Sequence, residues 1–171
     1  MLSHHESHVL ALIRKWQPTT AYFVRKALQR SLASSLSDSP GSVYPVVERL
    51  KRAGLVSAEA SENDGRKTDY ISCTEAGEEA IKAWLLDERS QDLLPEDPWR
   101  TRMIFADLLT PAQQQGWLAA LRQRVAAQLR EFDDQAALIE DKNYAAALEN
   151  ARLVTEARMV WIERCLANSI V

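Results

Sequence analysis

Residues 40–56, which read PGSVYPVVERLKRAGLV, predict a short amphipathic helix. Helical spacing gathers three apolar side chains on one face for packing: Val43, Val47 and Leu50. The positions left to meet a DNA groove or solvent are Ser42, Pro45, Glu48, Arg49 and Arg52. Because proline lacks the amide hydrogen, Pro45 fits best in a first turn, so we expect the helix proper to begin near Ser42 and to stop at Gly54. This is the shape of a DNA-recognition helix, but such helices are often only structural unless a supporting fold surrounds them.

The residues that follow predict a β-hairpin. Residues 55–60 and 68–73 alternate apolar and polar side chains, as strands with one packed face do. Between them lies a polar turn centred on Asp64-Gly65. A helix followed by a hairpin indicates a winged helix, in which Arg66 and Lys67 at the hairpin can reach DNA phosphates. A solvated turn without a role in DNA binding is the alternative for this pair.

Helical spacing predicts two helices before these motifs and one after them. The first ends at Pro18, and its apolar face is made of Val9, Leu10, Leu12, Ile13 and Trp16. The second runs from about Ala21 to Leu32, and the last is opened by Thr74. The buried face of the last helix is expected to hold Ile81, Trp84 and Leu85. Trp16 and Trp84 are expected in the core, because large apolar side chains at helical spacing usually pack inside.

Two stretches, residues 40–56 and DGRKTDYISCTEAG at residues 64–77, resemble the PadR family of bacterial transcription regulators in sequence and in spacing. The resemblance implies a mainly α fold, with a winged helix-turn-helix domain and a helical carboxy-terminal dimerisation domain. It also implies a homodimeric repressor, often released from its operator by a small molecule. Two positions depart from the family pattern. Ala21 stands where glycine is common, and Asp69 replaces a typical cation, which weakens the expected grip of the second strand on phosphate.

DNA contacts are expected from three elements. In the recognition helix the candidates are Ser42, Tyr44, Pro45 and Arg49. Arg49 is the best base reader, because a guanidinium can pair with guanine edges. Tyr22 and Lys26 in the second helix, and Arg66 and Lys67 in the wing, are expected to anchor phosphates, the wing in or near the minor groove. In a dimer, two recognition helices would enter successive major grooves roughly 34 Å apart and read a palindromic site in double-stranded DNA.

Length and charge fit this interpretation. The chain has 171 residues, 46% of them hydrophobic, and a net charge of -3. Residues 1–74 hold ten Lys and Arg against seven Asp and Glu, a net of +3, so the remainder carries -6. This asymmetry fits a DNA-facing half joined to an acidic half that phosphate repels. Cys73 and Cys165 lack the spacing of a zinc or redox site, and neither a signal peptide nor a membrane-spanning run is evident, so we expect a cytoplasmic protein.

An acidic connection separates the two halves of the chain. It spans residues 87–98, where Pro95 and Pro98 discourage continuous helix. We place the domain boundary at its start, which gives a winged helix-turn-helix domain at residues 1–86 and a helical dimerisation and effector domain at residues 87–171.

Three helices are expected in the second domain, at about 99–108, 111–139 and 144–170, with Thr110-Pro111 opening the middle one. The apolar stripe of the middle helix is Leu118, Leu121, Val125, Leu129 and Phe132. The last helix has one stripe made of Leu148, Ala151, Val154, Trp161 and Cys165, and another made of Leu153, Ala157, Val160 and Ala167. Two apolar faces need two partners, so we expect one to pack on the preceding helix and the other on a second subunit. A monomer that buries both faces is the alternative.

A small aromatic effector is expected to change the separation of the two recognition helices. It would bind between the winged domain and the carboxy-terminal helices, or at the dimer interface. The candidate lining residues are Trp99, Trp117 and Trp161. Ordinary hydrophobic packing is the alternative for each of them.

Other classes of function have weaker support in the sequence. His4 and His8 stand one helical turn apart beside His5, but no nearby carboxylate completes a site, so neither a metal nor another cofactor is expected. The chain has neither a Gly-rich phosphate loop nor a nucleophile motif, so it is not expected to be an enzyme. The remaining alternative is a winged-helix protein-interaction module without DNA binding, which Asp69 and the acidic balance favour.

Overall fold

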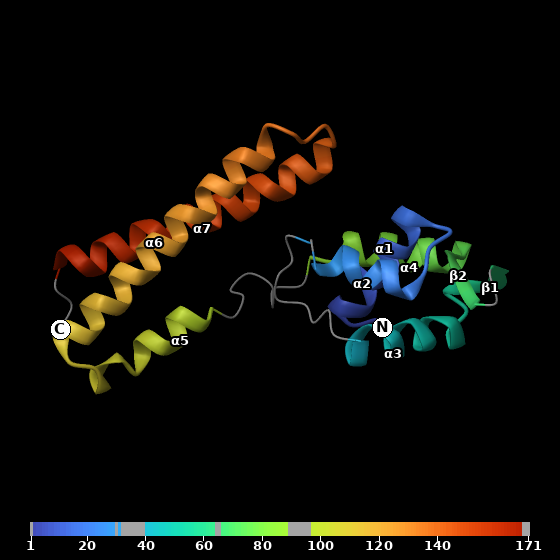
Figure 1. The fold of residues 1–171 in the computed structure, drawn as a ribbon, viewed down its shortest axis with the longest axis horizontal. Coiled ribbons are helices and arrows are strands. Elements are labelled where there is room, and N and C mark those ends of the chain that lie inside the picture. The colour runs from blue at the N-terminus through green and yellow to red at the C-terminus, as the bar shows by residue number, and fades with distance from the viewer. Residues whose placement is uncertain (1, 30, 32–39, 64–65, 89–96, 169–171) are drawn as a thin grey trace. The chain divides into compact units, whose positions relative to one another are not determined.

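The computed structural model describes residues 2–29, 31, 40–63, 66–88 and 97–168 (Figure 1). The chain divides into two compact units, Met1–Ser90 and Gln91–Val171, and each has its own hydrophobic core. Four sequence predictions fall outside the described residues: the turn at Asp64-Gly65, the break at Pro95, and the helix ends at Leu32 and Ile170.

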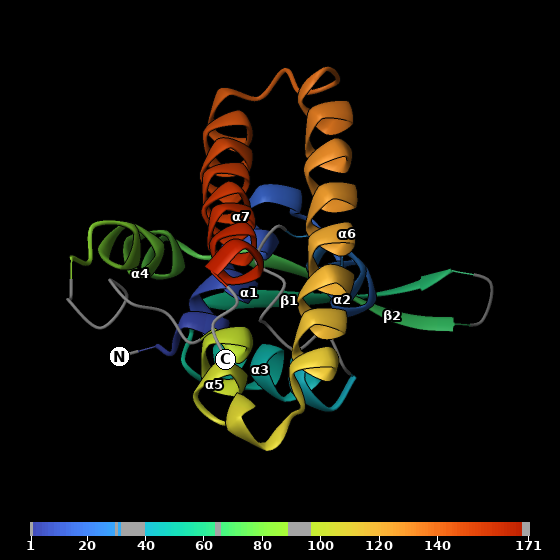
Figure 2. The ribbon, with the colours of Figure 1, turned by 90° about the vertical axis from the view of Figure 1, so that its left-hand side faces the viewer.

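The first unit is a winged helix, as predicted. Its elements in chain order are α1 (His4–Trp16), α2 (Ala21–Gln29), α3 (Pro40–Arg52), β1 (Val56–Asn63), β2 (Arg66–Cys73) and α4 (Glu75–Leu85). Figure 2 shows the β1–β2 hairpin extending away from the helices as the wing. The predicted apolar face of α3 is confirmed, because Val43, Val47 and Leu50 are buried in the core. Val46 on the same helix is buried with them.

The start of α3 differs from the prediction. The helix begins at Pro40, so Pro45 lies inside it rather than in its first turn. A proline inside a helix removes the hydrogen bond to the carbonyl four residues earlier. Here that carbonyl belongs to Gly41, the second residue of α3, so one hydrogen bond near the amino terminus of the helix is lost and the later ones remain.

Two large side chains that we expected in the core are exposed. Trp16 at the end of α1 is 49% exposed, and its ring meets Phe23 edge to face at 5.7 Å between centroids. Leu85 at the end of α4 is exposed as well. Trp16 and Leu85 are the last residues of α1 and α4. Each lies one turn beyond the last buried apolar residue of its helix, and the hydrophobic core does not extend that far. Trp84 is half-buried and contacts the ring of His4 edge to face.

The hairpin is longer than predicted. β1 and β2 pair antiparallel from Val56 opposite Cys73 to Asn63 opposite Arg66. The polar stretch that suggested a long turn belongs largely to strands, because backbone hydrogen bonds between strands do not need apolar side chains. At the other end, Ile71 and Thr19 exchange two backbone hydrogen bonds of 2.7 and 3.0 Å. This bridge ties the α1–α2 turn to the root of the wing.

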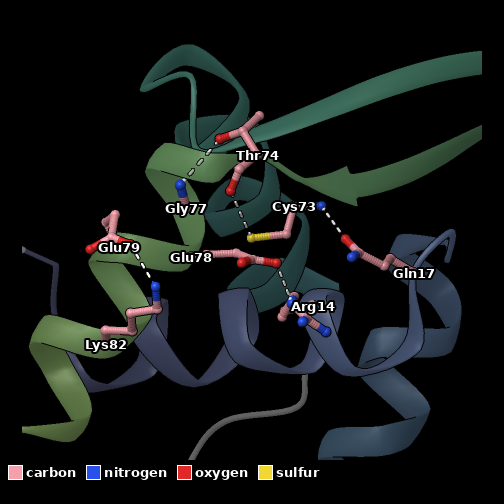
Figure 3. A network of polar contacts seen from close by, with 8 residues as sticks. All are labelled: Arg14, Gln17, Cys73, Thr74, Gly77, Glu78, Glu79 and Lys82. Atoms are coloured by element: carbon pink, nitrogen blue, oxygen red, sulfur yellow. Dashed lines mark hydrogen bonds and ion pairs between the residues drawn. The ribbon is translucent and has the colours of Figure 1, made fainter.

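Polar contacts join the end of α1, the end of β2 and the start of α4 (Figure 3), and the Cys73 N–H donates to Oε1 of Gln17 at 2.7 Å. The Thr74 hydroxyl accepts from the Gly77 N–H at 3.1 Å, which caps α4, and donates to the Gly54 carbonyl at 2.8 Å. Gly54 has a φ of 71°, the left-handed conformation predicted for the end of α3. Arg14 of α1 pairs with Glu78 of α4. The wing and α4 are therefore fixed to the same helical base.

The second unit consists of α5 (Pro98–Ile104), the 3-10 helix η2 (Ala106–Leu108), α6 (Pro111–Ala136) and α7 (Lys142–Asn168). In both views the two long helices, α6 and α7, run side by side (Figures 1 and 2). The predicted cap of α6 is confirmed: Thr110 and Gln113 form a capping box, and Pro111 takes the first helical position. The single helix expected at 99–108 is divided into α5 and η2.

The core between α6 and α7 follows the predicted stripe on α6 more closely than the one on α7. On α6, four of the five residues are buried and Leu129 is half-buried. On α7, Leu148 and Cys165 are buried as expected, whereas Val154 is exposed. Ile162, which belonged to neither predicted stripe, is fully buried. The second predicted stripe, Leu153, Ala157, Val160 and Ala167, is exposed in the single chain.

Within the described ranges, none of the helices combines the length and hydropathy that crossing a membrane requires.

Candidate nucleic-acid interface

The outer face of α3 carries the side chains that could enter a DNA groove. Tyr44, Pro45 and Arg49 are exposed there, and Ser42 is half-buried. Val43, Val46, Val47 and Leu50 hold the opposite face in the core, which fixes the orientation of the helix. The packing therefore presents three of the four predicted recognition residues to solvent.

A hollow of about 300 Å³ lies beside α3, between α2 and β2. Its polar and aromatic lining consists of Thr20, Tyr22, Tyr44, Glu48, Lys51, Thr68 and Asp69. The structure thus brings together Tyr22 and Tyr44, which the sequence analysis assigned to different helices. The hollow has the position of a contact surface shared by the recognition helix, the second helix and the wing.

Two cations gather on the ring of Tyr22. The ammonium of Lys26 lies 5.2 Å from the ring centroid, and the guanidinium of Arg25 lies 5.7 Å from it. Both distances suit a cation–π contact, which holds long side chains over a ring. Lys26 is therefore grouped with Tyr22, the other residue of α2 that is predicted to contact phosphate. Arg25 was not among the predicted site residues, but it contacts the same ring. Its position next to Lys26 in the sequence was the one indication that it could share the predicted phosphate contact.

Lys51 links the recognition helix to the wing. Its ammonium pairs with Asp69 of β2 at 3.0 Å and with Glu48 of α3 at 3.1 Å. Burial opposes the charge on Lys51, but hydrogen bonds to Asp69 and Glu48 outweigh it and raise its pKa. Asp69, which we expected to weaken the wing's grip on phosphate, thus has its charge offset by Lys51. Lys51 was not among the predicted site residues, although it stands at i, i+3 spacing from Glu48 in the sequence.

Arg49 lies on the other side of α3, toward α1. Its Nε donates to Oε1 of Glu6 at 2.7 Å. The backbone N–H of Ser3 and the Arg49 guanidinium both bind this carboxylate and lower the pKa of Glu6 from 4.5 to about 2. The structure therefore separates Arg49 from the Tyr22–Tyr44 hollow and gives it an acidic partner. In the sequence, Glu6 stands three residues after Ser3, which is the spacing of a capping box. That spacing indicates the cap of α1 but not the contact with Arg49.

The wing places two further candidates at its far end. In the strand register, Arg66 lies opposite Asn63 and Lys67 opposite Glu62, at the end of the hairpin away from the helical core. Their contact with DNA phosphates stays a prediction.

A larger pocket lies within the second unit. Its volume is about 610 Å³, and its lining consists of Asp97, Trp99, Arg100, Met103, Ile104, Val154, Ala157, Arg158 and Trp161. Trp99 and Trp161 share this pocket, whereas Trp117 is not among its lining residues and packs against the α6–α7 core. Arg158 pairs with Asp97 at 3.1 Å and lies 5.1 Å from the Trp99 ring centroid. Burial opposes ionisation of Asp97, but the Trp99 N–H and Arg158 outweigh it and lower its pKa.

The amino-terminal histidines lie on α1, near the start of the chain. His4 contacts Trp84, and His8 is half-buried, with burial lowering its pKa below the usual value and His4 and His5 adding to the effect. In the part of the chain that the structure describes, no three His, Cys, Asp or Glu side chains converge as metal ligands.

Comparison with known proteins adds to this picture. Residues 9–83 match the model of the transcriptional regulator PadR-like family. Bacillus subtilis PadR in complex with operator DNA is similar in structure, with a TM-score of 0.85 at 15% identity over 99% of both chains. Bacillus subtilis PadR in complex with p-coumaric acid has a TM-score of 0.76 at 16% identity, over 96% of this chain and 97% of that one. The Vibrio cholerae virulence activator AphA has a TM-score of 0.67 at 16% identity, over 96% of both chains. At these identities the likeness is one of fold. No curated protein sequence matches the chain.

Proposed function

Because residues 9–83 match the model of the PadR-like family of transcriptional regulators, we propose that this protein is a sequence-specific DNA-binding regulator. In the finer form of the proposal it acts in the bacterial cytoplasm as a homodimeric repressor on a palindromic operator. The observation that carries the proposal is the grouping of Tyr22, Lys26 and Tyr44 beside the exposed face of α3. A similarly folded PadR from Bacillus subtilis is described in complex with operator DNA, which supports this assignment.

In the proposed complex α3 enters the major groove. Ser42, Tyr44 and Pro45 meet the groove with the amino-terminal half of α3, and Arg49 reads a guanine edge. Tyr22 and Lys26 contact a phosphate at the flank, where the ring keeps the ammonium in place. Arg66 and Lys67 reach the backbone next to the neighbouring minor groove.

Dimerisation is proposed through the exposed stripe of α7. Leu153, Ala157, Val160 and Ala167 form an apolar stripe that is exposed in the single chain, and Ala157 also lines the pocket beside α5. A twofold contact would bury the same stripe from each subunit. It would also place two copies of α3 so that both halves of a palindrome are read.

An effector site is proposed in the pocket that Trp99 and Trp161 line. Aromatic walls and the cation of Arg158 suit a small aromatic ligand. Bacillus subtilis PadR is described in complex with p-coumaric acid, a molecule of this kind. Tryptophan fluorescence during titration with aromatic acids, dyes and drugs checks the proposal. A ligand at this site should quench Trp99 and Trp161, and silence from every compound counts against it.

The deciding test compares Arg49→Ala and Lys67→Ala on duplexes selected by the wild-type protein from a randomised pool and on scrambled duplexes. Arg49→Ala should reduce discrimination between the two by about 1–3 kcal/mol, because a base contact is lost. Lys67→Ala should weaken both alike and lower the slope of affinity against salt by about one. Equal losses on selected and scrambled DNA for Arg49→Ala would reject its role as a base reader.

A protein-interaction module without DNA binding is the second candidate. The pairing of Lys51 with Glu48 and Asp69 favours it, because these carboxylates offset a cation that DNA would otherwise attract. Failure of the wild-type protein to bind any duplex at low salt would support this alternative.

A further inference from the structure

Glu6 of α1 and Arg49 of α3 join two helices through residues that lie 43 positions apart in the sequence. Arg49 donates from Nε to Oε1 of Glu6 at 2.7 Å. The second oxygen, Oε2, accepts from the Ser3 N–H at 2.9 Å and from the Ser3 hydroxyl at 3.0 Å. A single carboxylate therefore closes the first turn of α1 and holds the side chain proposed to read a base.

The two partners differ in how far water reaches them. The Glu6 side chain is 17% exposed, whereas that of Arg49 is 50% exposed. Glu6 is the fixed partner because three hydrogen bonds hold it in place. The bond uses Nε, at one edge of the guanidinium. The two Nη nitrogens at its tip can therefore still donate the paired contact that guanine O6 and N7 accept.

A carboxylate paired with this arginine can have one of two effects. It can compete with DNA for the guanidinium, or it can hold the side chain in the conformation that contacts a base. An ion pair with a half-exposed partner shifts an equilibrium by about fivefold or less. A paired contact with guanine discriminates between bases by roughly fivefold to a hundredfold or more. Glu6 is thus too weak to withhold Arg49 from its base. It can still restrict the rotamers of the long side chain before DNA arrives, which lowers the entropy lost on binding.

We propose that Glu6 is a positioning residue for base recognition, which orients Arg49 toward the major groove from the first turn of α1. The inference rests on the proposed DNA-binding function. It makes sequence preference depend on a helix that does not itself enter the groove. With a pKa of about 2, Glu6 keeps its charge throughout the physiological range, so the pair does not depend on pH there.

The test uses the full chain and four variants: Glu6→Gln, Arg49→Ala, the double variant and Glu79→Gln. Glutamine at position 6 can still complete the capping box, so α1 keeps its first turn while the charge of the pair is lost. Glu79→Gln is the matched control, because it makes the same change in charge at an exposed ion pair, with Lys82 on α4. Each protein selects from a randomised pool of duplexes, and the enriched pools are sequenced. Binding to selected and scrambled duplexes is then measured.

Arg49→Ala should abolish the sequence preference at one base pair. Glu6→Gln should reduce the preference at that same base pair by roughly fivefold. Its binding to scrambled DNA should hold or tighten, since a negative charge near DNA has been removed. The double variant should be no less selective than Arg49→Ala, and Glu79→Gln should keep the wild-type preference.

Three results would overturn the inference while the proposed function stands. In the first, Glu6→Gln keeps the wild-type base preference and binds every duplex more tightly, which would mean that Glu6 only weakens DNA binding. In the second, the double variant loses preference by the sum of the two single losses, and in the third, Arg49→Ala keeps every base preference. If the wild-type protein enriches no sequence at all, the proposed function fails and this inference fails with it.

Discussion

At the scale of single residues, the junction between α3 and α4 leaves no room for a side chain at Gly77. A Cβ built there would lie 2.2 Å from the backbone carbonyl oxygen of Leu55 and 2.7 Å from Sγ of Cys73. The same carbonyl accepts the Thr74 N–H at 3.0 Å, so it cannot move away without breaking a hydrogen bond. The close approach explains why glycine occupies a helical position, where it is otherwise unfavourable.

Gly77→Ala should destabilise the winged helix by about 2–3 kcal/mol, because the added methyl group displaces backbone rather than a flexible side chain. Gly116→Ala in α6 is the matched control. That position has nothing within 4 Å of a new Cβ, so alanine should stabilise its helix by about 1 kcal/mol. Denaturation of both proteins, followed by circular dichroism, measures the two effects. Equal stability of the two variants would contradict the steric explanation.

Among the candidate site residues, the exposed face of α3 could be predicted, but the partners of its side chains could not. Helical spacing sufficed to place Pro45 and Arg49 outward, because burial of Val43, Val47 and Leu50 leaves them no other face. Arg49 pairs with Glu6, which lies 43 positions away in the sequence. Neither helical spacing nor a local motif indicates that two such distant residues will meet. The same holds for the approach of Lys51 to Asp69.

At the scale of elements, helices with strong end signals were predicted well. Thr110-Pro111 fixed the start of α6, because the cap and the proline both act locally. The strands of the wing were predicted too short, since their outer residues are polar and pair through the backbone alone. In α7 apolar residues stand on several sides, so periodicity could not decide which face turns inward, and Ile162 was missed.

Ile162→Ala should therefore destabilise the α6–α7 pair by about 2–4 kcal/mol, since the fully buried side chain leaves a cavity. Leu138→Ala serves as the control. Leu138 is 84% exposed just beyond α6, and its removal should change stability by about 0.5 kcal/mol or less. The midpoint of urea denaturation compares the two. Similar midpoints would show that the core of the second unit is centred elsewhere.

At the scale of the whole molecule, the two halves of the chain differ in net charge, and the exposed apolar stripe of α7 lies in the second half. Residues 1–74 carry a net +3 and the remainder -6, so phosphate attracts one half and repels the other. The exposed apolar stripe of α7 lies in the acidic half. The proposed dimer contact and the proposed DNA contact are thus made by different parts of the chain.

Leu153→Glu should convert the proposed dimer to a monomer, because Leu153, 51% exposed on α7, would place a carboxylate within a twofold apolar contact. Operator affinity should then fall roughly a hundredfold, since two half-sites are no longer bound together. Sedimentation velocity and duplex binding measure the two outcomes. Leu138→Glu makes the same chemical change away from the stripe and should leave both unaltered. A wild-type protein that sediments as a monomer would refute the proposed assembly directly.

The bridge between Thr19 and Ile71 has a mechanical consequence for the wing. At Ile71, β2 has a neighbour on both edges, β1 on one and the α1–α2 turn on the other. Beyond Ile71, β2 keeps β1 as its backbone partner, and the ion pair of Asp69 with Lys51 adds a side-chain link to α3. The inner part of the wing, from Ile71 to Asp69, is therefore held by the helices, and its bending stiffness falls beyond Asp69. Any flexing needed to follow the curvature of a DNA groove falls on the outer part of the hairpin and leaves α2 undisturbed.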